Sequence, residues 1–196
     1  SQLPHSLPNL DHYLKRILPN PGDWLPTDLR RAAVLCPLIE HQGQDHVLFV
    51  LRPKGTQAHA GQISFPGGMH TGTESPLQTA RRECFEEVGA PKDSITPLGE
   101  LEPRESSSKI HVHCVVARVA PFDLQPDPRE VARILHMPLD ELRNEHRWAE
   151  KPPPIPAPDR AHGTSPHFQF GDDLLWGLTA RFVRDLVSHI PSSAGD

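Results

Sequence analysis

A helix with clear boundaries lies in the middle of the chain and limits the folds that the chain can adopt. Ser75 and Gln78 have the spacing of a capping box, and Pro76 stands at the first helical position. Gly89 can take the left-handed conformation that often ends a helix. The sequence therefore predicts a helix over residues 76–88, whose apolar stripe packs on a sheet.

Segments with the apolar pattern of buried strands lie on both sides of this helix. They occupy residues 32–39, 46–51, 97–101 and 110–119. Apolar residues at helical spacing predict two further helices, over residues 8–18 and 175–190. Strands interleaved with helices predict a layered α/β or α+β domain.

The length of the chain, 196 residues, predicts a single domain that spans residues 1–196. Within it, residues 1–30 are expected to form an N-terminal helix followed by a proline-rich lead-in. Residues 151–166 are expected to form a long polar loop. Residues 191–196 are expected to be a disordered tail.

The charge balance and the apolar runs argue against two classes of partner. There are 20 basic and 25 acidic residues, a formal charge of −5, whereas nucleic-acid-binding domains are usually basic. No apolar run reaches the ~18–20 residues of a membrane span, and no secretory signal is visible at the N-terminus. Three cysteines without a CxxC pair favour a reducing compartment. We therefore expect a cytoplasmic protein with no nucleic-acid and no membrane partner.

Three glutamates lie beside the apolar stripe of the central helix. At 100° per residue, Glu83, Glu86 and Glu87 fall within an arc of roughly 100°. Carboxylates this close repel one another, and a bound divalent cation such as Mg²⁺ would remove the conflict. The simpler alternative is a solvated helix face. Two glycines before the helix, Gly67 and Gly68, let the backbone approach a ligand closely and favour the metal site.

The spacing of these residues resembles the Nudix box, GX5EX7REUXEEXGU, in which U is a bulky aliphatic residue. The match runs from Gly68 through Glu74 and Arg82 to the end of the helix, and every glycine and polar position is filled. Cys84 and Ala90 are smaller than the usual U residues. Because Cys84 lies on the apolar stripe, we expect it to fill the core rather than to act as a nucleophile.

The resemblance to the Nudix hydrolase family implies a Nudix-type α/β/α sandwich with a mixed central sheet. It also implies hydrolysis of a nucleoside diphosphate linked to another moiety. Mg²⁺ or Mn²⁺ would be held by Glu83, Glu86 and Glu87, with the carbonyl of Gly67 as a further ligand. Metals of this kind neutralise a diphosphate and activate a water molecule for attack.

Further catalytic roles are expected for residues beside these ligands and in a later loop. Arg82, next to the acids, would orient them, and Glu74 would support the loop before the helix. The general base could be a helix glutamate or an acid from a later loop, for which Glu130 is our candidate. Glu100 and Glu102 are alternatives to Glu130.

A second motif, upstream of the box, is similar to the signature of the coenzyme A pyrophosphatase branch of the family. It comprises residues 51–53 and 59–68. One position within it and one between its two parts differ from the branch. Pro53 replaces a serine, and Gln57 replaces an arginine. The resemblance implies cleavage of coenzyme A or acyl-CoA to 3′,5′-ADP and 4′-phosphopantetheine.

Three residues of this motif, Arg52, His59 and Phe65, are the candidate substrate contacts. Two of them have a purely structural alternative: Arg52 can be a charge at a strand end, and His59 can be a loop residue with a backbone partner. His111 and His113 lie on one face of a predicted strand, and we expect them to pack across strands rather than bind a metal.

Other functions remain open at this point. The same fold and metals could cleave a different conjugate, such as ADP-ribose or a dinucleotide polyphosphate. A Nudix-like module could also bind a nucleotide conjugate without cleaving it, although such modules usually have broken acids in the box. In each case the predicted partner is a small nucleotide conjugate, and the resemblance also allows a homodimer.

Overall fold

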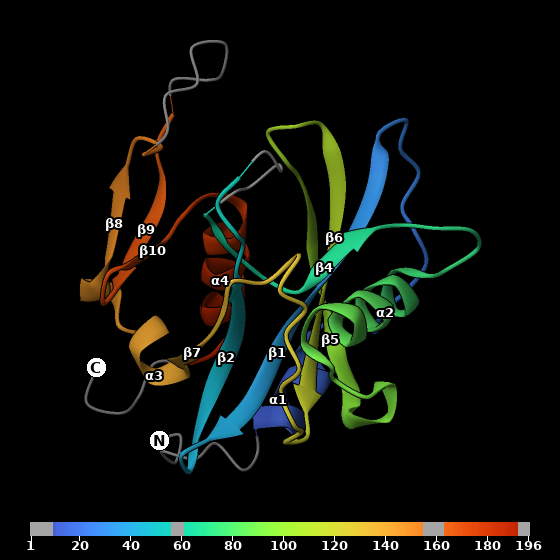
Figure 1. The fold of residues 1–196 in the computed structure, drawn as a ribbon, viewed down its shortest axis with the longest axis horizontal. Helices are drawn as coiled ribbons and strands as arrows, with labels where there is room; N and C mark the ends of the chain where they lie inside the picture. The colour runs from blue at the N-terminus through green and yellow to red at the C-terminus, as the bar shows by residue number, and fades with distance from the viewer. Residues whose placement is uncertain (1–9, 56–60, 155–162, 192–196) are drawn as a thin grey trace.

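The computed structural model describes residues 10–55, 61–154 and 163–191 (Figure 1). Its main sheet has seven strands, five of which follow one another in the order β3-β2-β1-β6-β5. These strands are β3 (Ile63–Ser64), β2 (Gln44–Leu51), β1 (Arg30–His41), β6 (Ile110–Val119) and β5 (Ile95–Glu105). Two more strands complete the sheet: β4 (Gly67–Met69) pairs with β1, and β7 (Arg133–Pro138) pairs with β2.

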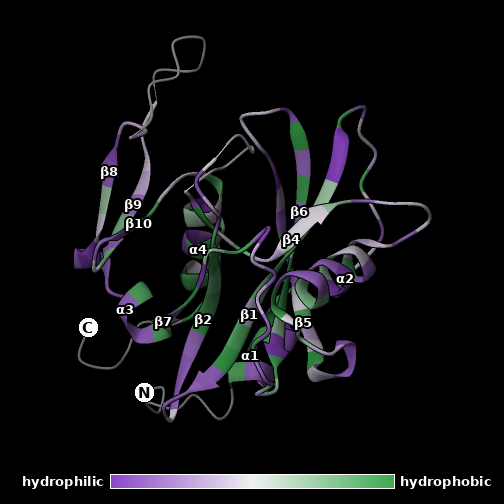
Figure 2. Ribbon diagram, viewed as in Figure 1, coloured by the Kyte–Doolittle hydropathy of each residue, from purple (hydrophilic) through white to green (hydrophobic). Residues whose placement is uncertain are grey.

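The main sheet is mixed, as predicted. Strands β1 and β6 run parallel, and the other paired strands run antiparallel. Both β1 and β6 read as continuous apolar segments because side chains on both of their faces are buried. Figure 2 shows hydrophobic residues along β1 and β2, between the helices.

Helices cover the sheet on both faces. One face packs against α1 (Leu10–Ile17) and α4 (Gly177–His189) in a core that contains Phe49 and Phe65. The other face packs against α2 (Pro76–Val88). The predicted α/β/α sandwich is therefore confirmed, and Figure 1 shows α2 and α4 on opposite sides of the strands.

The boundaries of α2 agree with the sequence prediction residue for residue. The side chain of Ser75 accepts a hydrogen bond from the backbone of Gln78, and the side chain of Gln78 bonds back to the backbone of Ser75. At the other end Gly89 has a φ of 85° and donates its N–H to the carbonyl of Phe85. Both ends are set by local contacts, which is why the sequence predicts them well.

A second, three-stranded sheet was not predicted. It contains β8 (Trp148–Lys151), β9 (Ser165–Phe170) and β10 (Asp173–Leu175) and lies beside α4 in Figure 1. The loop predicted over residues 151–166 is therefore wrong at both ends. Leu175, assigned above to the last helix, ends β10 instead.

The remaining elements are short. They are α3 (Leu139–Leu142) and two single-turn 3₁₀ segments, Lys92–Ser94 and Glu145–Arg147. None of the helices in the described residues is long and apolar enough to cross a membrane. The three cysteines are free and buried.

Helix α1 is attached through leucines that reach the core of the sheet. Leu14 is fully buried in the core on this face of the sheet, so truncation leaves a cavity there. We expect Leu14→Ala to lower the free energy of unfolding by about 2–5 kcal/mol, measured by urea denaturation. Leu25→Ala is the matched control, because Leu25 is 48% exposed and its loss should cost about 0.5 kcal/mol or less. Equal effects of the two changes would contradict the docking of α1.

Candidate metal centre

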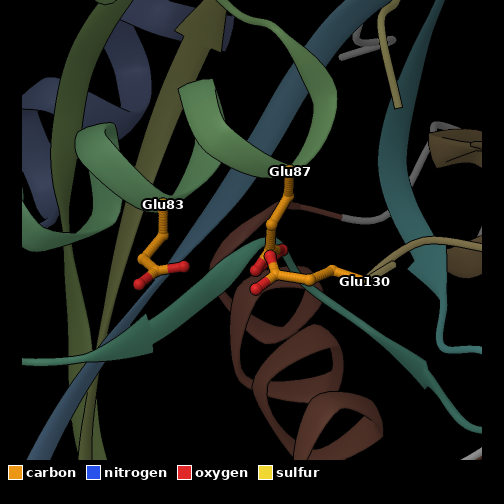
Figure 3. A group of neighbouring side chains, drawn as sticks. All are labelled: Glu83, Glu87 and Glu130. Atoms are coloured by element: carbon orange, nitrogen blue, oxygen red, sulfur yellow. The ribbon is translucent and has the colours of Figure 1, made fainter. Parts of the chain in front are cut away.

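Three carboxylates from two parts of the chain meet beside the main sheet. Glu83 and Glu87 come from α2, and Glu130 comes from the turn before β7 (Figure 3). One carboxylate oxygen of each lies within 4.8 Å of the others. This is the only group of three or more possible metal ligands of this kind within the described ranges.

Backbone hydrogen bonds bring Glu130 to the helix. The carbonyl of Glu87 accepts from the N–H of Asp127, and the carbonyl of Val88 accepts from the N–H of Gln125, so the end of α2 is fastened to the loop between β6 and β7. Asp127 in turn accepts from the N–H of Glu130 at 3.0 Å. The loop therefore turns back on itself and presents Glu130 to the helix.

Glu87 is the most buried of the three acids. Its side chain is 2% exposed and lies 3.2 Å from the guanidinium of Arg52. The backbone N–H of Gly67 also donates to its carboxylate, at 3.3 Å. Burial raises the pKa of Glu87 to about 7, and the charge of Arg52 opposes this shift in part.

Glu83 lies against Gly68, which explains the need for glycine at this position. A Cβ atom on Gly68 would lie 2.5 Å from the carboxyl carbon of Glu83. At Gly67, a Cβ atom would lie 2.6 Å from the backbone of Ala33 and Val34. The two glycines thus let β4 fit between β1 and the acids of α2. Burial also raises the pKa of Glu83.

Arg82 connects the acids of the helix to the loop that precedes it. Its Nε donates to Glu74 at 2.7 Å, its Nη1 donates to Glu83 at 2.9 Å, and its Nη2 donates to the carbonyl of Met69 at 3.1 Å. This contact with Arg82, together with hydrogen bonds from Thr71 and Thr79, lowers the pKa of Glu74 to about 2.

The structure does not bring Glu86, the third predicted metal ligand of the helix, into the group. Its side chain is 48% exposed and pairs with Arg82 at 3.2 Å. The two alternatives to Glu130 also lie apart from the group. Glu100 pairs with His113, and Glu102 is exposed on β5.

The predicted substrate contacts have three different outcomes. Arg52 lies at the site, but its guanidinium contacts Glu87, the hydroxyl of Ser64 at 3.0 Å and the carbonyl of Glu130 at 3.4 Å. Phe65 is 1% exposed and stacks on Phe49 in the core, so its ring offers no surface to a substrate. His59 lies outside the described residues, as does Gln57.

Two site contacts were missed by the sequence reasoning. It did not foresee the pairing of Arg52 with Glu87, which depends on how β2 faces α2. Nor did it find Trp24, whose indole N–H donates to the carbonyl of Glu74 at 2.8 Å. A tryptophan within a polar, proline-rich segment was the only available signal.

The donor set fits a divalent cation. Three carboxylates converge, and for two of them burial raises the pKa, so the charged forms lack solvation in the folded protein. Arg52 is the one basic group paired with Glu87 in the described chain. A hard cation with oxygen ligands would supply the missing positive charge.

Comparison with known proteins gives a consistent result. The sequence description of the NUDIX domain matches residues 29–157, more than half of the chain. A relative from Pectobacterium atrosepticum, named "Uncharacterized Nudix hydrolase NudL", is 36% identical over 163 residues, covering 82% of this chain and 83% of its own length. A relative of the same name from Photorhabdus laumondii is 32% identical, covering 88% of this chain and 91% of its own.

Solved structures share the fold. A "MutT/nudix family protein" from Enterococcus faecalis superposes with a TM-score of 0.56 at 15% identity. The match covers 83% of this chain and 63% of that chain. At this identity the likeness concerns the fold alone.

The ion pair between Glu74 and Arg82 gives a pH-dependent stability. The pKa of Glu74 is lowered from 4.5 to about 2, so the pair stabilises the fold above pH 4.5 and is lost as the pH falls towards 2. We expect Glu74→Gln to lower the free energy of unfolding by about 2 kcal/mol at pH 7, and by progressively less below pH 4.5. Urea denaturation between pH 2.5 and 7 measures this difference.

The control for this experiment is Glu102→Gln, which removes an exposed carboxylate from β5. Its effect should be small at every pH. A Glu74→Gln effect that stays constant from pH 7 to pH 2.5 would show that the ion pair with Arg82 does not stabilise the fold.

Proposed function

Because the chain belongs to the Nudix hydrolase family, we propose that it is a Mg²⁺- or Mn²⁺-dependent pyrophosphohydrolase of coenzyme A or acyl-CoA. Its products would be 3′,5′-ADP and 4′-phosphopantetheine. The observation that carries the hydrolytic part is the convergence of Glu83, Glu87 and Glu130. The substrate part rests on the motif of residues 51–53 and 59–68.

The residues proposed to hold the metal are Glu83 and Glu87, with the carbonyl of Gly67, and one carboxylate oxygen of Glu130 lies close enough to join them. Glu86 would join them after release from Arg82. When bound, a divalent cation would neutralise the oxygens of the diphosphate and lower the pKa of a water molecule. Glu87 is held in place for this role by Arg52 and the N–H of Gly67.

The reaction adds water to one phosphorus atom and breaks its bond to the bridging oxygen. Glu130 is also proposed as the general base: its second carboxylate oxygen, the one not facing the metal, would accept the proton of the attacking water. Its position on a loop, at the edge of the group, leaves it half-exposed, whereas Glu87 is buried. Arg82 orients Glu83 through their contact at 2.9 Å.

Arg52 is proposed to serve both the acids and the substrate. Its side chain is 17% exposed, so part of the guanidinium is accessible beside Glu87. A diphosphate next to this group would meet a planar donor suited to phosphate oxygens. His59 stays a proposed substrate contact on the strength of the motif. The cytoplasmic location and a homodimer also stay proposals.

Product analysis tests the proposed substrate. The protein is incubated with coenzyme A, ADP-ribose and diadenosine polyphosphates, first in Mg²⁺ and then in Mn²⁺. We expect 3′,5′-ADP to appear from coenzyme A faster than product appears from the others. Cleavage of another conjugate with coenzyme A left intact would overturn the specificity but keep the hydrolytic site. Binding without any cleavage would favour a sensor.

Substitution of the buried acid tests the hydrolytic site. We expect Glu87→Gln to lower kcat/KM by about 100-fold or more, because it removes a charged ligand while keeping the side-chain volume. Glu102→Gln serves as the control, since Glu102 lies outside the group and should leave the rate within about twofold. If Glu87→Gln leaves the rate within about threefold, the role assigned to Glu87 is wrong.

A further inference from the structure

The segment between α1 and β1 is fastened across the outer edge of the main sheet. Strand β5 forms this edge, and its Glu100 N–H donates to the carbonyl of Pro19 at 2.9 Å. The Glu100 carboxylate accepts in turn from the N–H of Gly22 at 3.2 Å. We call residues 18–25 the lead-in.

Gly99 allows the lead-in to lie close to β5. A Cβ atom on Gly99 would lie 2.3 Å from the Cβ of Leu18 and 3.1 Å from the carbonyl oxygen of Pro19. Leu18 itself is 4% exposed and belongs to the core that holds α1. The start of the lead-in is therefore fixed by packing as well as by hydrogen bonds.

The other end of the lead-in reaches the loop before α2. The indole Nε1 of Trp24 donates to the carbonyl of Glu74 at 2.8 Å, fifty residues further along the chain. The ring of Trp24 makes T-shaped contacts with the rings of His70 and His113, and its centroid lies 5.0 Å from the centroid of each. It also packs on the core between α2 and the sheet. Trp24 thus contacts the loop through a hydrogen bond and through its ring.

The side of the ring that faces the sheet has rigid support. His113 is buried, its Nδ1 bonds to the Glu100 carboxylate, and its Nε2 accepts from the N–H of Leu25 at 3.5 Å. Glu100 is the same residue that bonds to the start of the lead-in. The pair of His113 and Glu100 therefore fixes both the path of the lead-in and the position of Trp24.

Glu74 is the point at which this network meets the metal centre. Trp24 holds its carbonyl, and Arg82 binds its carboxylate and also donates to Glu83. We propose that Trp24 is a positioning residue for the metal centre, acting through Glu74 and Arg82 on Glu83. The inference rests on the proposed function, because it assumes that Glu83 binds a metal.

Trp24 is not a catalytic residue, since its side chain contacts the loop and His113 within the described residues and not the three carboxylates. Its loss is expected to weaken metal binding, because supporting contacts of this kind tune ligand orientation. The metal alone is thus a sufficient probe, and no substrate is needed. Mn²⁺ binding is measured by calorimetry on the whole chain.

The test compares two tryptophans that make the same kind of hydrogen bond. Trp24→Phe removes the indole N–H and keeps an aromatic ring. Trp148→Phe is the matched control, because its indole Nε1 also donates to a backbone carbonyl, that of Leu142, at 2.8 Å. Trp148 lies on β8 of the second sheet. Thermal unfolding with a chelator present reports the stability that each variant loses.

We expect Trp24→Phe to weaken Mn²⁺ binding about tenfold and Trp148→Phe to leave it within about twofold, at similar losses of thermal stability. If Trp24→Phe does not fold, Gly99→Ala carries the test, because it displaces Leu18 and leaves Trp24 and every acid intact. It should weaken Mn²⁺ binding severalfold.

Mn²⁺ binding that is unchanged in the folded variant, beside normal binding by the unsubstituted protein, would overturn the inference and leave the proposed function standing. Equal weakening by Trp24→Phe and Trp148→Phe would also overturn it, because the effect would then follow stability alone. No Mn²⁺ binding by the unsubstituted protein would overturn both the metal centre and this inference.

Discussion

The burial of the Glu87 carboxylate is the constraint on which the site depends. A buried charge requires partners, and here they are the guanidinium of Arg52 and the N–H of Gly67. These partners come from the residue that directly follows β2 and from β4, so α2 must lie close to the end of β2 and to β4. Close packing in turn requires glycine at two successive positions, since a Cβ on Gly67 or Gly68 would collide with β1 or with Glu83. One acid therefore links the helix, the strands and the glycine pair.

Electrostatics explains why a cation belongs in this arrangement. Glu83, Glu87 and Glu130 converge, yet the bonds of Arg82 are divided among Glu74, Glu83 and Glu86. Burial disfavours the charged forms of the two helix acids, and removing one partner from a buried ion pair is costly. The site thus holds more negative charge than its basic partners neutralise, and binding of a divalent cation would offset the excess.

Local signals in the sequence were sufficient for the central helix, and the structure brings two of its three predicted acids, Glu83 and Glu87, into one group. The caps of α2 are formed by residues within the segment itself, so its ends were predicted without tertiary information. The small sheet was missed because its strands are short and because Leu175 fits the helical spacing of the residues after it. Phe65, which follows the two-residue strand β3, lies in the core rather than at the site. So short a strand has no alternating pattern from which the direction of the next side chain could be predicted. The contact of Trp24 with a distant backbone carbonyl leaves no trace in composition or spacing.

We propose that Glu83, Glu87 and Glu130 form one metal site. Anomalous scattering from crystals soaked in Mn²⁺ tests this site directly, because the signal locates the metal without reference to activity. We expect a peak between the carboxylates of Glu83 and Glu87, within coordination distance of both and beside Glu130. A peak at another position, or no peak at millimolar Mn²⁺, would contradict the proposed metal site.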